Sequence, residues 1–209
     1  MMESMITLLG YSSILIMGVL LGLLGGGGSI LTIPILVYGF GISPLLATGY
    51  SLFVVGVSSS VAVYQYYKEK WVHIKVGVLF GIPATVGVLL SRMVILPYLP
   101  NQMQLAGVTF SKDKLILWIF ATLVLVISLF MIKSKDVEEV DKAAKNPVKI
   151  QYPPILLGGF ILGVITGFVG AGGGFMIVPA LLVLTPITLK QSIATSLFII
   201  SIKSSMGFL

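Results

Sequence analysis

Two glycine-led stretches decide the fold: residues 25–34 read GGGGSILTIP, and residues 170–179 read GAGGGFMIVP. The prolines that end them, Pro34 and Pro179, lie 145 positions apart, the difference between 34 and 179. The same offset continues on both sides without a gap. It pairs Gly18 with Gly163, Gly22 with Gly167, Gly25 with Gly170, Ser51-Leu52-Phe53 with Ser196-Leu197-Phe198, and Ser59-Ser60 with Ser204-Ser205. Glycines coincide easily in apolar sequences, but the shared Ser-Leu-Phe at an unchanged offset indicates two related repeats.

The composition is that of a membrane protein. Of the 209 residues, 57% are hydrophobic and only 10% are charged, and the mean hydropathy is +1.10. Soluble domains carry about a quarter charged residues, because charge covers their surface. So few charges cannot coat a globule of this size, and we therefore expect the surface to face lipid.

Several kinds of chemistry are excluded by what the sequence lacks. There is no cysteine and one histidine, His73, so we expect no disulfide, metal site or nucleophilic triad. No Gly-Lys-Ser/Thr follows either glycine cluster, which argues against a nucleotide-binding loop. The net charge of +6 lies in short loops, and the positive-inside rule explains it without a nucleic-acid partner. We therefore expect neither an enzyme nor a bound cofactor.

The apolar runs predict the number of helices. Runs long enough to cross the hydrocarbon core, about 20 residues, cover residues 5–24, 47–67, 76–96, 115–132, 152–169 and 189–209. The run that follows each glycine cluster reaches only about 15 Å as a helix, half a bilayer. The expected fold is all-α, a polytopic membrane protein whose two homologous repeats each contain a broken or re-entrant glycine-rich segment.

The repeat offset also sets the expected domain boundaries. The first transmembrane repeat would cover residues 1–132, a charged linker residues 133–151, and the second repeat residues 152–209. Adding 145 places the counterparts of residues 71–132 beyond position 209, so we expect the second repeat to be incomplete at its C-terminus and the chain to be a fragment.

The two glycine clusters are the candidate binding site. A helix that begins inside the bilayer leaves its first N–H groups unpaired, and its dipole places partial positive charge there. A small anion satisfies both, and glycine lets it approach the backbone closely. The candidate substrate-binding residues are Gly25, Gly26, Gly27, Gly28, Ser29, Tyr50, Ser51, Gly170, Gly172, Gly173, Gly174, Thr195, Ser196 and Lys203. Tight helix crossing is the alternative role for glycine, and we favour it for Gly163 and Gly167 at their four-residue spacing.

Lys203 is the most informative charge within the predicted spans. It lies 13 residues beyond Lys190, which is about 20 Å along a helix axis. Snorkelling to the far interface and a role facing the substrate are equally compatible with this depth. For Arg92, close to Pro97, snorkelling is favoured. All seven acidic residues lie in loops or at chain ends, so the buried charge is positive, which favours an anionic substrate over a cation.

Three features, present in both halves, together resemble the sulfite exporter TauE/SafE family: the glycine cluster, the proline about nine residues on, and a later Ala-Thr-Ser-Leu-like element. The later elements are Ala47-Thr48-Gly49-Tyr50-Ser51-Leu52-Phe53 and Ala194-Thr195-Ser196-Leu197-Phe198. The resemblance covers nearly the whole chain. It implies a polytopic transporter of sulfite, organosulfonates or related small anions, with a pore formed by the two repeats. Tyr50 departs from the pattern by standing where the second half has Thr195, so it would narrow the site or alter substrate choice.

The residues and the resemblance together predict a secondary transporter, acting as an exporter, of a small anion such as sulfite, an organosulfonate or a related carboxylate. A passive anion channel and a non-transporting membrane scaffold remain open as alternatives. The expected partners are the small anionic substrate and the lipid bilayer, with no nucleic acid, and a homo-oligomer is compatible with the sequence. The expected location is the plasma membrane, crossed several times, and the inner membrane if the source is bacterial.

Overall fold

The structure is a computed structural model that describes residues 12, 29–100, 102–105, 108–133, 151–170 and 173–207. The glycines at 25–28, Gly172, the linker at 134–150 and, apart from residue 12, the expected span at residues 5–24 lie outside the described residues.

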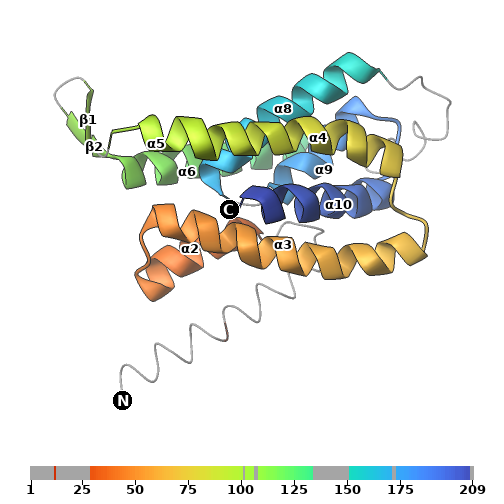
Figure 1. Cartoon of the computed structure of the whole chain (residues 1–209), viewed down its shortest axis with the longest axis horizontal. Coiled ribbons are helices and arrows are strands. Elements are labelled where there is room, and N and C mark those ends of the chain that lie inside the picture. Colours follow the sequence, from red (N-terminus) through yellow and green to blue (C-terminus); the bar gives the residue numbers. More distant parts are fainter. Residues whose placement is uncertain are drawn as a thin grey trace.

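The described residues are almost entirely helical, which confirms the all-α expectation (Figure 1). In chain order the elements are α2 (Ser29–Pro34), the π-helical turn η1 (Ile35–Gly39), α3 (Pro44–Lys68), α4 (Ile74–Leu90), the π-helical turn η2 (Ser91–Ile95), α5 (Leu96–Tyr98), α6 (Lys112–Lys133), α8 (Tyr152–Val169), α9 (Gly174–Leu184) and α10 (Leu189–Gly207). One feature was not expected. A short antiparallel hairpin of β1 (Gln102–Leu105) and β2 (Val108–Ser111) connects α5 to α6 and pairs Gln102 with Ser111.

The long helices agree with the predicted spans. Three helical stretches have the length and hydropathy to cross a membrane: Pro44–Lys68, Ile74–Tyr98 and Tyr152–Val169. The helices α6 and α10, with 22 and 19 residues, occupy the remaining two predicted spans that the structure describes. The chain is therefore a multi-pass membrane protein.

The outer faces of the long helices are apolar, as a lipid contact requires. On α3, Phe53, Val57, Val61 and Tyr64 follow one another at helical spacing and are between 52% and 65% exposed. Side chains three or four positions apart lie on one face of a helix. In water such a continuous apolar face would mark an interface, and in a polytopic protein the bilayer covers it.

The two segments that follow the glycine clusters are short helices. Ile30–Gly39 and Gly174–Leu184 are apolar but shorter than a span. The 11 residues of α9 extend about 16 Å, roughly half the hydrocarbon core. Each segment has a proline inside it, Pro34 in α2 and Pro179 in α9. The expectation of half-length helices is confirmed for both segments.

A row of glycines joins α8 to α4, which lie side by side in Figure 1. An ideal Cβ placed on Gly159 would lie 3.3 Å from the carbonyl carbon of Phe80, and one on Gly163 would lie 2.7 Å from the Cα of Ala84. One on Gly167 would lie 2.8 Å from the Cα of Val88. Only glycine permits backbones to approach this closely, so the packing role expected for Gly163 and Gly167 is confirmed.

The helices that the 145-residue offset relates pack against each other. An ideal Cβ on Gly56 of α3 would lie 3.2 Å from the Cβ of Ser204 in α10, and one on Gly207 would lie 3.4 Å from Cδ1 of Leu52. The two helices therefore run antiparallel along their contact (Figure 1). The short helices α2 and α9 also touch. Inverted repeats produce contacts of this kind, and the repeat itself stays a prediction.

Candidate functional site

The second glycine cluster forms a sharp joint between α8 and α9. Gly170 closes α8 with φ at 71°, and Gly173 opens α9 with φ at 77°. Both values lie in the left-handed region, which glycine adopts without the cost that a side chain would impose. The joint places the first turn of α9, Gly174 to Ile177, in buried surroundings. A buried helix start offers unpaired N–H groups and partial positive charge.

Lys203 lies against this helix start. Its side chain is only 1% exposed, and its Nζ donates a hydrogen bond to Oγ1 of Thr166 at 2.8 Å. The Thr166 hydroxyl donates in turn to the carbonyl of Gly163 at 3.3 Å. An ideal Cβ on Gly173 would lie 2.8 Å from the Nζ of Lys203. The lysine therefore occupies the space that a side chain at Gly173 would fill.

Arg92 is a second cation near the same joint. Its Nη2 donates to Oγ1 of Thr48 at 3.0 Å, and the Thr48 hydroxyl donates to the carbonyl of Leu45 at 2.7 Å. Thr48 itself packs directly against Gly170. Arg92 lies in the π-helical turn η2 and is half-buried. The sequence favoured snorkelling for this residue, but its guanidinium is bound to a buried threonine 44 positions away.

The described acidic residues do not balance these charges. Glu69 caps the C-terminus of α3, and Asp113 lies in the first turn of α6. Within the described part of the chain, Lys203 and Arg92 form hydrogen bonds to threonine and no ion pair with a carboxylate. A charge at membrane depth costs about 3 kcal/mol on insertion-based scales. An anion beside the two cations would offset this cost.

Several buried polar atoms have no hydrogen-bond partner. Among the described residues these are the Oγ atoms of Ser51, Ser91, Ser192 and Ser204 and the Nε of Arg92. Ser91 lies near the end of α8, with its Cβ 3.0 Å from an ideal Cβ on Gly167. Buried polar atoms are nearly always satisfied, so these groups require a water or a polar ligand as a partner.

The structure brings only some of the predicted site residues together. Gly170, Gly173, Gly174 and Lys203 surround the joint. Thr195 lies eight residues before Lys203 on α10, about 12 Å along the helix, and accepts a hydrogen bond from the N–H of His73 at 3.0 Å. Its observed bond is therefore to the start of α4.

The remaining predicted residues are distributed along the two long helices. Ser51 is fully buried in α3, and Ser196 donates to the carbonyl of Ile193 at 2.8 Å. Tyr50 is 49% exposed, beside Gly49, whose ideal Cβ would lie 3.8 Å from Nη1 of Arg92. Ser29 begins α2, and its side chain, like the glycines at 25–28 and Gly172, lies outside the described residues.

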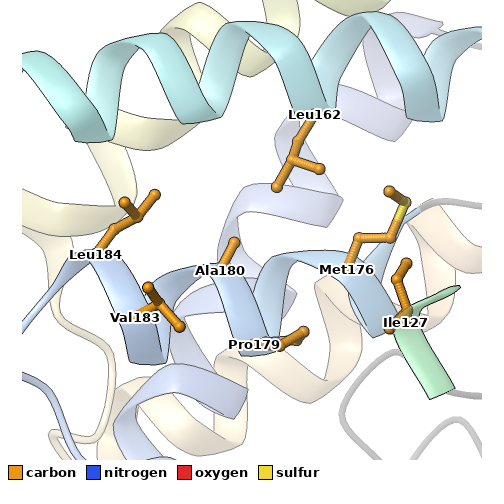
Figure 2. A pocket seen from close by; sticks show the side chains of 7 residues that line it. All are labelled: Ile127, Leu162, Met176, Pro179, Ala180, Val183 and Leu184. Carbon is orange, nitrogen blue, oxygen red and sulfur yellow. The ribbon is translucent and has the colours of Figure 1, made fainter. Parts of the chain in front are cut away.

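A separate pocket lies between α6, α8 and α9, with a volume of about 250 Å³ (Figure 2). Its lining is wholly apolar and comprises Ile127, Leu162, Met176, Pro179, Ala180, Val183 and Leu184. Without a charge or a hydroxyl group, this lining offers nothing to an anion. The polar joint, and not this pocket, is therefore the candidate site.

A polytopic helical protein with two half-length helices and buried cations has the features of a membrane transporter. Comparison with known families agrees. The model of the family described as "Sulfite exporter TauE/SafE" matches residues 11–209. The chain belongs to the TauE/SafE family, and the resemblance seen in its sequence is confirmed.

Curated relatives carry transporter names as well. A probable membrane transporter protein of Methanocaldococcus jannaschii is 28% identical over 93% of this chain and 68% of its own length. One from Xylella fastidiosa strain Temecula1 is 30% identical over 93% of this chain and 69% of its own length. The probable membrane transporter protein YunE of Bacillus subtilis is 28% identical over 92% of this chain and 73% of its own length. No solved structure matches the chain at a significant level.

Proposed function

We propose that this transporter carries a small anion, such as sulfite, an organosulfonate or a related carboxylate, and acts as an exporter. The observation that carries the proposal is the buried ammonium of Lys203 at the start of α9, where its hydrogen bond goes to Thr166 rather than to a carboxylate. A lysine at this depth keeps its charge only where something compensates it. A small oxyanion would accept hydrogen bonds from Nζ and from the first N–H groups of α9.

The site uses three elements that meet at the joint. The left-handed glycines turn the chain so that α9 begins inside the protein, α10 supplies Lys203, and the last turn of α8 supplies Thr166. Because helices fix the two kinds of donor, the Nζ of Lys203 and the first N–H groups of α9, these donors would select an anion by its charge and size more than by the group attached to it. This is the reason for proposing a class of small anions.

The first glycine cluster is proposed to supply the matching half of the site. The motivation is the repeat offset, which pairs the glycines at 25, 27 and 28 with those at 170, 172 and 173. The contact of α2 with α9 and the antiparallel pairing of α3 with α10 support this arrangement. Two half-helices directed at one midplane site are a common plan in secondary transporters.

A secondary carrier is favoured over a passive channel because a buried charge that the bound anion compensates suits a binding site that is occluded in turn from each side. Counterflow in proteoliposomes tests the choice. Vesicles loaded with unlabelled sulfite should accumulate external labelled sulfite above its equilibrium level. A channel would only equilibrate the label, and a scaffold would leave it outside, so either result would reject the carrier.

A further inference from the structure

We infer that Arg92 is a second substrate-binding cation and that the transported anion carries two negative charges. The inference rests on the proposed anion transport and deepens it by naming the charge state of the substrate. Sulfite and thiosulfate in their doubly ionised forms belong to this class, whereas alkylsulfonates and monocarboxylates do not.

The two cations are held in the same way at opposite ends of one joint. Lys203 donates to the hydroxyl of Thr166 and lies against Gly173. Arg92 donates to the hydroxyl of Thr48, which packs against Gly170. In both cases the threonine hydroxyl donates its proton to a backbone carbonyl of its own helix. Thr166 donates to Gly163, and Thr48 donates to Leu45. Each threonine therefore offers only its oxygen to the cation, which positions the cation without neutralising it.

Arg92 lies inside a π-helical turn. The segment Ser91–Ile95 is π-helical, between the α-helical stretches α4 and α5. Such turns occur frequently at functional sites. The buried Oγ of Ser91 and the buried Nε of Arg92 have no hydrogen-bond partner within the described ranges. Two unsatisfied groups on adjacent residues are what a bound oxyanion would satisfy.

Charge balance leads from this geometry to a dianion. A monoanion would compensate Lys203 or Arg92 but would leave the other cation with only a neutral threonine. A dianion that contacts both cations compensates both. Arginine is suited to the second position because its planar fork of donors binds two oxygens of one oxyanion.

The experiment compares thiosulfate, a dianion, with methanesulfonate, a monoanion, as competitors of labelled sulfite uptake in proteoliposomes. The wild-type protein should prefer thiosulfate by at least about tenfold, the equivalent of 1.4 kcal/mol. Arg92→Gln should weaken the apparent affinity for thiosulfate by about tenfold or more, because it removes one charge-assisted interaction. The same substitution should change the apparent affinity for methanesulfonate by less than about threefold. Arg92→Lys should retain more of the thiosulfate preference than Arg92→Gln. Lys114→Gln, on the exposed side of α6, is the matched control and should leave both affinities unchanged.

The possible outcomes distinguish a failure of the dianion inference from a failure of the proposed anion transport. If the wild-type protein takes up sulfite but Arg92→Gln weakens both competitors equally, or neither, the dianion inference is wrong and anion transport stands. If neither anion competes and no sulfite is transported, the proposed function itself is wrong. Should Arg92→Gln fail to fold, wild-type preference for methanesulfonate or equal affinity for both anions would still overturn the inference.

Discussion

Thr166 holds two different parts of the site at once: its hydroxyl accepts a hydrogen bond from Lys203 at 2.8 Å, and its backbone carbonyl accepts one from the N–H of Gly170 at 2.8 Å. One residue therefore ties the position of the buried ammonium to the end of α8. A change in the lysine or in the joint is transmitted to the other through this threonine.

Lys203→Met should weaken anion binding by about tenfold or more, on the order of 1.4 kcal/mol. The substitution keeps the length of the side chain and removes its charge, so the compensation of a bound anion is lost. Equilibrium binding of labelled sulfite to purified protein measures the effect, with Lys114→Met as the control because Lys114 is exposed on α6. A variant that inserts normally and binds sulfite as well as the wild type would show that Lys203 has only a structural role.

Thr166→Val should weaken sulfite binding by about tenfold or more while leaving the helices intact. Valine has nearly the same shape, but it removes the acceptor of Lys203, and a hydrogen bond to a charged group contributes about 1.5–3 kcal/mol. The measurement is sulfite affinity together with thermal unfolding. Thr122→Val is the control, because Thr122 bonds only to the carbonyl of Trp118 on the exposed side of α6. Equal behaviour of the two variants in the binding assay would contradict the role given to Thr166.

Gly173→Ala should both destabilise the protein and abolish binding. The backbone φ of 77° is unfavourable for alanine, at a cost of about 1–3 kcal/mol, and the new methyl group would displace Lys203 and Thr166. Gly81→Ala is the control, since an ideal Cβ there meets only Ile199 at an ordinary 3.6 Å. A lower midpoint of thermal unfolding for Gly173→Ala, and an unchanged or higher one for Gly81→Ala, is the expected pattern. Wild-type stability of Gly173→Ala would mean that the joint has a different backbone.

Cysteines introduced at Gly56 and Ser204 should form a disulfide, because the two Cβ positions are 3.2 Å apart. The chain has no cysteine of its own, so no other disulfide competes. Disulfides join Cβ atoms at about 3.5–4.5 Å, so a small relaxation of α3 and α10 suffices. Thiol counting by mass spectrometry after mild oxidation measures the yield. The pair Val57→Cys with Ser204→Cys is the control, since Val57 faces outward and is 52% exposed. Equal cross-linking of both pairs would contradict the antiparallel packing.

Run length and repeat offset predicted most of the fold, but only part of the site. The half-length helices followed from where the glycines stop, and Lys203, within the last predicted span, is only 1% exposed. The bond between Arg92 and Thr48 joins residues 44 positions apart on different helices, and helical spacing predicts neighbours only within one helix. Hydropathy also gives no information about the π-helical turn that contains Arg92. Both strands of the hairpin alternate polar and apolar residues, as QMQL and VTFS, which is a strand pattern. The hairpin was missed because the prediction searched only for apolar runs long enough to span a membrane.

The contact of Lys203 with both Thr166 and Gly173 has a consequence for how variants of this site combine. A larger residue at position 173 is excluded while the lysine is present, and the lysine is unsupported once the threonine is lost. The effects of substitutions at residues in contact are not additive. A double variant at any two of these positions is therefore expected to differ from the sum of its two single variants.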